Sequence, residues 1–145
     1  MDGNSEVEFT LAVPMDRSYA YISITGSGNT SAITESLGLE PTNFWNVGDK
    51  RSKGSPYEFA RWDFKDAAFE KEFLDEALNA VVQFIEEKNL QLTQLPGDFE
   101  ACIQCVGYHE QASPGFHLSR ELLTRLGNLG IAIDFDLYCH AERTG

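Results

Sequence analysis

The sequence predicts an α+β domain, a two-layer sandwich in which helices cover one face of a mixed or antiparallel sheet. Several segments alternate apolar and polar residues, which is typical of half-buried strands. None of them is continuously apolar, as strands covered on both faces would be. One long central segment instead carries an apolar stripe at helical spacing. With 145 residues the chain has the length of one domain, in which residues 1–17 form an N-terminal extension or extra strand and residues 18–140 the core.

The first predicted elements are two strands and a short helix. Residues 6–13 alternate in polarity, and residues 18–25 do so again. The inward side chains of the second strand are Ala20, Ile22 and Ile24. A helix then begins at Thr30 or Ser31, both good capping residues, and ends at Gly38.

Residues 40–57 are predicted to form an extended loop, because they contain two prolines, two glycines and a basic cluster at 50–53. Structureless loops of this length are unusual in compact domains and are often functional. A strand over 59–64 follows the loop. Its side chains on one face are Ala60, Trp62 and Phe64.

The clearest helix is predicted over residues 66–88. Its apolar stripe consists of Phe73, Leu74, Ala77, Leu78, Val81, Phe84 and Ile85. Such a stripe indicates a helix that packs on a core. A strand over 99–106 comes next. Its inward set is Phe99, Ala101, Ile103 and Cys105.

The C-terminal third is predicted to hold a hairpin, a helix and a strand. Residues 107–117 are interpreted as a turn region whose return strand is 116–118. Ser119 caps the next helix, which ends at Gly127 or Gly130. Residues 131–140 form the last strand. Because Ile22, Ile103 and Ile133 share inward parity, we expect both long helices on the same face of the sheet.

Two segments share one spacing and indicate an internal duplication. Thr30, Ile33 and Leu37-Gly38 correspond to Ser119, Leu122 and Leu126-Gly127. Each segment follows a predicted strand. A repeated strand–helix unit of this kind occurs in ferredoxin-like folds, so that arrangement is one form the sandwich could take.

The composition is strongly acidic, with 11 Lys and Arg against 23 Asp and Glu and a net charge of −12. A field of this sign repels phosphate backbones and anionic lipid, so we expect neither nucleic acid nor membrane as a partner. It attracts a basic protein. The N-terminus lacks a secretion signal, and an odd count of three Cys favours a reducing, cytoplasmic compartment.

No motif in the sequence indicates catalysis, a metal site or a cofactor. Cys102 and Cys105 have the spacing of a redox pair, but residues three apart on a strand point to opposite faces. The glycine-containing turn before Thr30 lacks the lysine of a phosphate-binding loop. Asp134 and Asp136 project from one strand face, which is more typical of a solvated surface than of acid–base chemistry.

The 44–53 segment is the candidate ligand site. It places Trp45 just before three of the chain's eleven basic residues, and together these groups can stack on a ligand and pair with an anion. The candidate binding residues are Trp45, Asp49, Lys50, Arg51 and Trp62. The alternative is that Trp45 fills a small core under the loop while the charges are solvated.

The candidate interface is the sheet face turned away from the helices. By parity it carries Tyr19, Tyr21, Phe59, Arg61, Glu100, Gln104, Asp134, Asp136 and Tyr138. Aromatic residues of this number are typical of interface cores. We expect this face to be covered by the N-terminal segment around 7–13, by a second copy of the chain or by a functional partner.

Several stretches of the chain resemble one known family. They are 33–41, Gly48-Asp49, Trp62, 118–123 and 130–138. In these stretches the sequence is similar to the bacterial family called "domain of unknown function 4279", over roughly residues 18–138. The resemblance implies a small bacterial cytoplasmic α+β domain and implies no catalysis.

Two functions from different classes follow. The first is a non-enzymatic protein-interaction module that binds a basic partner, as an immunity-type inhibitor or accessory protein does. The second is a small-ligand or anion-binding domain, or an enzyme, that uses the 44–53 loop. A pocket beside Trp45 and Arg51 would favour the second function, and a flat acidic face would favour the first.

Overall fold

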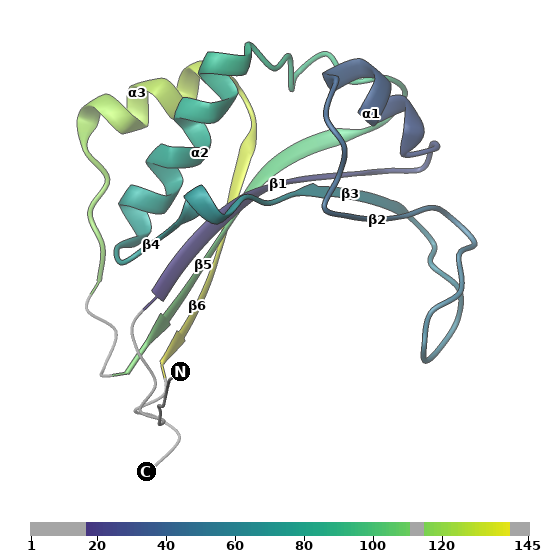
Figure 1. Ribbon diagram of the computed structural model, residues 1–145, viewed down its shortest axis with the longest axis horizontal. Helices are drawn as coiled ribbons and strands as arrows, with labels where there is room; N and C mark the ends of the chain where they lie inside the picture. Colours follow the sequence, from purple (N-terminus) through teal and green to yellow (C-terminus); the bar gives the residue numbers. More distant parts are fainter. Residues whose placement is uncertain (1–16, 111–114, 140–145) are drawn as a thin grey trace, which may run out of the picture.

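A computed structural model describes residues 17–110 and 115–139. They form one six-stranded sheet with the helices on one side of it (Figure 1). The strands are β1 (Arg17–Gly26), β2 (Asn43–Trp45), β3 (Ala60–Phe64), β4 (Glu70–Lys71), β5 (Glu100–His109) and β6 (Ala132–Cys139). The helices are α1 (Ser31–Leu37), α2 (Leu74–Lys88) and α3 (Arg120–Leu129), with a 3-10 turn, η2, at Ala67–Phe69.

The sheet is mixed. Its strand order is β2-β3-β1-β5-β6, and β4 pairs with the first residues of β1. Neighbouring strands are antiparallel except β5 and β6, which are parallel and joined through α3. This confirms the α+β class and the mixed sheet. The third helix and the parallel pair extend the chain beyond the six-element unit of ferredoxin-like folds.

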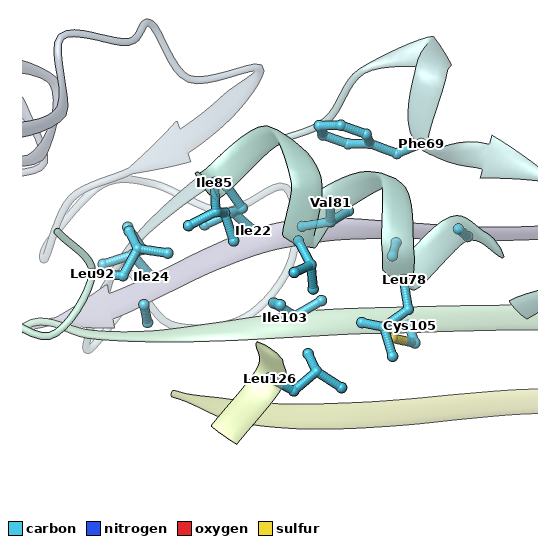
Figure 2. Packing of buried hydrophobic residues seen from close by; sticks show 14 of the residues in the cluster. Ile22, Ile24, Phe69, Leu78, Val81, Ile85, Leu92, Ile103, Cys105 and Leu126 are labelled. Carbon is cyan, nitrogen blue, oxygen red and sulfur yellow. The ribbon is translucent and has the colours of Figure 1, made fainter. Parts of the chain in front are cut away.

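The core lies between the sheet and α2, which packs over β1 and β5 (Figure 2). Ile22 and Ile103 face each other across β1 and β5, and both are fully buried. Ile133 continues the same row on β6 and packs against the core from its edge. The shared inward parity of these three side chains is therefore confirmed.

The predicted long helix begins later than expected, at Leu74 rather than at residue 66. Asp66 accepts a hydrogen bond from the Ala68 amide and starts the η2 turn, which buries Phe69. The chain then runs extended through β4 because its backbone pairs with β1. Phe73, assigned to the apolar stripe, is the exposed N-cap residue of α2.

The segment 40–57 is not a plain loop, since β2 pairs with β3 inside it. The connection that follows β2 projects from the sheet on the side away from the helices (Figure 1). The predicted return strand over 116–118 is absent from the described residues, because β5 itself continues to His109. The helix after Ser119 passes through Gly127 and ends at Gly130, whose φ is 68°.

The last strand, β6, has the predicted alternation but little cover. Its inward residues Phe135 and Leu137 remain 37% and 41% exposed. Within the helical layer, α2 makes its contacts with β1 and β5. The predicted strand over 6–13 lies outside the described residues. Within the described part, no helix has the length and apolarity needed to cross a membrane.

Candidate functional site

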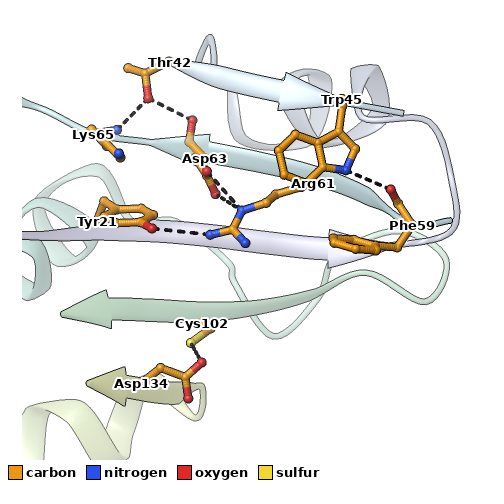
Figure 3. A network of polar contacts seen from close by, with 9 residues as sticks. All are labelled: Tyr21, Thr42, Trp45, Phe59, Arg61, Asp63, Lys65, Cys102 and Asp134. Carbon is orange, nitrogen blue, oxygen red and sulfur yellow. Dashed lines mark hydrogen bonds and ion pairs between the residues drawn. The ribbon is translucent and has the colours of Figure 1, made fainter. Parts of the chain in front are cut away.

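The candidate site is the face of the sheet that α1, α2 and α3 leave uncovered, here called the open face. Strand register places alternate residues of five strands on it. Tyr21 faces Gln104, which faces Asp134, in one cross-strand row. Figure 3 shows Tyr21, Arg61 and Trp45 together on this face. The predicted interface residues thus lie on one surface.

Aromatic rings lie across the open face in three stacked groups. Trp45 stacks on Tyr57 with ring centroids 4.0 Å apart and meets Phe59 edge-on at 5.8 Å. The Tyr19 and Tyr21 rings stack at 6.2 Å. The Tyr108 and Tyr138 rings stack at 5.1 Å on β5 and β6. The aromatic row is Tyr57, Trp45, Phe59, Tyr21, Tyr19, Tyr108 and Tyr138.

Cations link the rings of the aromatic row. The Arg61 guanidinium lies 5.9 Å from the Trp45 centroid and donates to the Tyr21 hydroxyl at 3.4 Å (Figure 3). Lys65 Nζ lies 4.5 Å from the Tyr21 centroid. Arg17 lies between two rings, 5.3 Å from Tyr19 and 5.7 Å from Tyr108. Each contact is a cation–π arrangement, which holds both the ring and the cation in place.

Two of these cations are already paired with carboxylates. Arg61 Nε donates to both carboxylate oxygens of Asp63, at 3.0 and 3.1 Å, and Asp63 is buried. Arg17 Nε lies 3.0 Å from a Glu70 oxygen. Burial raises the pKa of the Tyr21 phenol, which therefore stays protonated and able to hydrogen-bond. The two arginines on the open face are thus balanced by carboxylates, whereas Lys65 brings a positive charge to the Tyr21 ring.

The β6 edge of the open face is acidic. Asp134 accepts a hydrogen bond from the Cys102 thiol, and Asp136 accepts one from the Gln104 amide at 2.8 Å. Both of these donors are neutral, and both aspartates are exposed. Asp134 and Asp136 therefore keep their charge available to a partner.

Burial raises the pKa of the Cys102 thiol to about 11, and the hydrogen bond to Asp134 adds to this effect. Burial also raises the pKa of Cys105, to about 12. Thiols with such pKa values are protonated at neutral pH and react slowly. Cys102 and Cys105 are free thiols.

We expect Asp134→Asn to make Cys102 more reactive. The substitution removes a negative charge beside the thiolate, so the Cys102 pKa should fall and the thiolate fraction near pH 8 should rise. Alkylation by iodoacetamide, followed site by site with mass spectrometry, measures this. Cys105 is the internal control and should stay slow. An unchanged rate at Cys102 would show that burial alone sets its pKa.

Three of the predicted loop residues lie around Tyr57. Trp45 stacks on its ring, Arg51 lies near the ring, and the Asp49 carbonyl accepts a hydrogen bond from its backbone amide at 3.1 Å. Trp45 belongs to the aromatic row and donates its Nε1 hydrogen to the Phe59 carbonyl at 3.0 Å. Asp49 accepts from the Asn46 amide and so closes the turn after β2. Arg51 lies 5.0 Å from the Tyr57 centroid, and Lys50 is exposed. A cavity of about 510 Å³ borders β2 and α1. Asn46 lines this cavity, but the predicted binding residues Trp45, Asp49, Lys50 and Arg51 do not.

Trp62, a predicted binding residue, is fully buried on the opposite face of the sheet. Its Nε1 donates to Thr34 Oγ1 at 3.0 Å, which fixes α1 on the sheet. It therefore belongs to the core and not to a surface site. Parity within 59–64 already placed Trp62 beside Ala60, on the side away from Arg61.

Sequence reasoning missed four members of this surface, namely Arg17, Tyr57, Lys65 and Tyr108. Arg17 and Tyr108 follow from the same alternation once β1 and β5 are extended by a few residues. Tyr57 and Lys65 lie outside the strands, and only the path of the chain brings them to the rings. Within the described ranges, no group of three or more His, Cys, Asp or Glu residues could hold a metal ion.

Comparison with known proteins gives one match. A family model described as a domain of unknown function, DUF4279, matches residues 16–140. The chain belongs to this family. The DUF4279 match begins one residue before β1 and ends one residue after β6, so it spans the whole described sheet. No curated protein and no solved structure matches the chain.

Proposed function

We propose that the chain is a non-enzymatic protein-interaction module whose open face binds a basic partner protein. The observation that carries this proposal is the aromatic row, which spans the sheet from Tyr57 to Tyr138. Tyrosine and tryptophan supply large contact area with a polar handle, and they are enriched at interface cores. A helix-free sheet face lined by such rings fits a docking surface.

The charge pattern supports a basic partner rather than a second copy of the chain. The cations of the open face are held by carboxylates and rings, whereas Asp134 and Asp136 have neutral partners. If two copies paired antiparallel about Phe135 of β6, Asp134 of one copy would lie opposite Asp136 of the other. Like charges directly opposite each other destabilise a strand pair. A lysine- or arginine-bearing partner avoids this repulsion and matches the net charge of −12.

The alternative function, ligand binding by the 44–53 loop, has less support. The stack of Trp45 on Tyr57 occupies a ring face that a ligand would need. The Asp49 carboxylate is engaged within the turn. For the compartment, we propose the cytoplasm, because the free thiols of Cys102 and Cys105 suit a reducing environment.

Site-specific crosslinking tests the proposal. A photo-reactive phenylalanine analogue replaces Tyr138 on the open face or, as the matched control, Leu123 on α3. The two side chains are 49% and 53% exposed. We expect a basic protein to crosslink to position 138 and not to position 123. Equal labelling at both positions would refute the open face as the docking surface.

The partner recovered in this way allows a quantitative prediction. Tyr21→Ser with Tyr138→Ser should weaken binding by about 1,000-fold, because hot-spot aromatics contribute about 2 kcal/mol or more each when truncated and every 1.4 kcal/mol is a factor of about ten. The free energy of unfolding should change by less than the free energy of binding, since both rings lie outside the main core. Titration calorimetry and thermal unfolding of the same variant separate the two effects. A loss of stability with unchanged affinity would contradict the proposal.

Electrostatic steering gives a further expected result. Association should slow as salt rises past about 0.1 M, where the Debye length is about 10 Å. Asp134→Asn with Asp136→Asn should lower the association rate and flatten its salt dependence. Glu76→Gln with Glu87→Gln changes the net charge equally, on α2 away from the open face, and should do neither. Stopped flow measures the association rates of both double variants. Equal rates would mean that association depends on the net charge and not on the open face, which contradicts the proposal.

A further inference from the structure

A cavity distinct from the one beside β2 and α1 lies on the helix-covered face of the sheet, at the first turn of α2. It has a volume of about 300 Å³ and is lined from the start of β1, the end of β5, the N-terminal turn of α2 and the segment 115–117. In Figure 1 these parts meet at the lower left, where β1 begins and β5 ends. We call it the Ser18–His109 cavity. It does not share a residue with the aromatic row.

Two buried polar atoms in this cavity have no hydrogen-bond partner among residues 17–110 and 115–139. They are Ser18 Oγ and His109 Nδ1. Ser18 is only 1% exposed. Buried polar groups in folded proteins are nearly always hydrogen-bonded, so two unpaired atoms lining one cavity indicate a missing ligand.

The backbone beside Ser18 leaves room for the His109 ring. Ser18 pairs with Gly107 across β1 and β5. A Cβ at Gly107 would lie 3.3 Å from His109 Nε2 and 3.3 Å from Leu137 Cδ2. The His109 imidazole therefore lies over Gly107, close to β1, the strand that carries Ser18. A larger residue at position 107 would push the ring away, so the position of the ring depends on this glycine.

The walls of the cavity favour a cation. Its lining residues include Glu72 and Asp75, the aromatic residues Phe73 and Phe116, and a second histidine, His117. Among the described residues that line it there is no lysine or arginine. A serine oxygen accepts hydrogen bonds, and so does Nδ1 of a neutral imidazole that carries its proton on Nε2. Phenyl faces attract cations. The α2 amide groups would favour an anion, but Asp75 and Glu76 in the first turn of that helix oppose one.

We propose that the Ser18–His109 cavity binds an organic ammonium or guanidinium group. Ser18 Oγ and His109 Nδ1 accept its hydrogen bonds, and Glu72 and Asp75 balance its charge. The volume is at the lower end of the range for small-ligand sites. The cation is either a free amine or the side chain of a lysine or arginine, and both share this chemistry.

Titration of the whole protein with four small probes tests the chemistry. The probes are n-butylammonium and n-butylguanidinium, with n-butanol as the neutral control and n-butyrate as the anionic control. We expect saturable NMR shifts at Ser18 and His109 with the two cations only. The imidazole nitrogens should report the Nε2-protonated tautomer with Nδ1 as the acceptor. Binding of butanol or butyrate as tightly as butylammonium would overturn the proposal.

Ser18→Ala separates binding from folding. It should weaken butylammonium binding at least about tenfold, because a hydrogen bond to a charged group is lost. It should also raise the melting temperature or leave it unchanged, because the hydroxyl is unpaired without ligand. Ser23→Ala, a buried serine on the opposite face of β1, is the matched control and should leave cation binding unchanged. A fall in melting temperature for Ser18→Ala would show that the hydroxyl is already paired, which contradicts the proposal.

A final arm identifies the source of the cation. N-acetyl-lysine-N-methylamide presents the same ammonium group on a peptide backbone. If it binds at least as tightly as butylammonium, the cavity accepts a protein side chain. If only the free amine binds, the cavity takes a small molecule. Both results support a cation site, and binding of neither cation would refute it.

Discussion

Trp62→Ala should lower the free energy of unfolding by about 3–5 kcal/mol, the range for removing a buried aromatic side chain. Trp62 is fully buried and stacks near Phe64, with ring centroids 6.4 Å apart. Its loss would leave a cavity between α1 and the sheet and would also leave Thr34 without its hydrogen-bond donor. Urea unfolding followed by circular dichroism measures the change.

Trp45→Ala is the natural comparison for this variant, because it removes the same side chain from the other face of the sheet. Trp45 is only partly buried, and its main contacts are the rings of Tyr57 and Phe59. We expect a loss of about 1–2 kcal/mol, since an aromatic pair contributes about 0.5–1.5 kcal/mol beyond its area. Equal losses for the two tryptophans would mean that Trp62 is not the core residue.

The second large effect is expected at Ile103, at the centre of the core on β5. Ile103→Ala should cost about 2–5 kcal/mol, because the side chain is fully buried under α2. Ile133→Ala, in the same cross-strand row, should cost less than half as much, since Ile133 lies at the partly covered edge. Chemical denaturation of both variants gives the comparison. A reversed order would mean that the helical layer extends over β6.

Polarity alternation was enough to predict β1, β3, β5 and β6, because each has one buried and one open face. The Ile22, Ile103 and Ile133 row follows from that alternation alone. The segment 66–73 was included in the predicted helix because Phe73 fits the apolar stripe that continues along α2. Its backbone instead pairs with the start of β1, and no local pattern records such a partner. The three-residue strand β2 is too short to show a period.

The candidate sites differ in how far the sequence could predict them. Tyr21 and Tyr138 were placed on the open face by parity, which is a local property of each strand. The contacts of Arg17 and Lys65 with those rings depend on how three strands lie together. The Ser18–His109 cavity could not be predicted, because residues 91 positions apart meet only through the register of β1 and β5. Trp62 was misassigned because its residue type was given more weight than its inward position.

The central place of β1 also determines the order in which the protein can fold. β1 is the first described strand, yet it lies between β3 and β5. Ile22 cannot pair with Ile103 until Ile103 has been synthesised, 81 positions later in the chain. At synthesis rates of about 5–20 residues per second, that wait lasts roughly 4–16 s on the ribosome. During this time β1 lacks its neighbour β5. Strand pairing over such sequence distances is also slow to nucleate. The nascent chain therefore passes through a stage in which β1 can associate with other chains, and chaperones that bind extended apolar segments would act on it then.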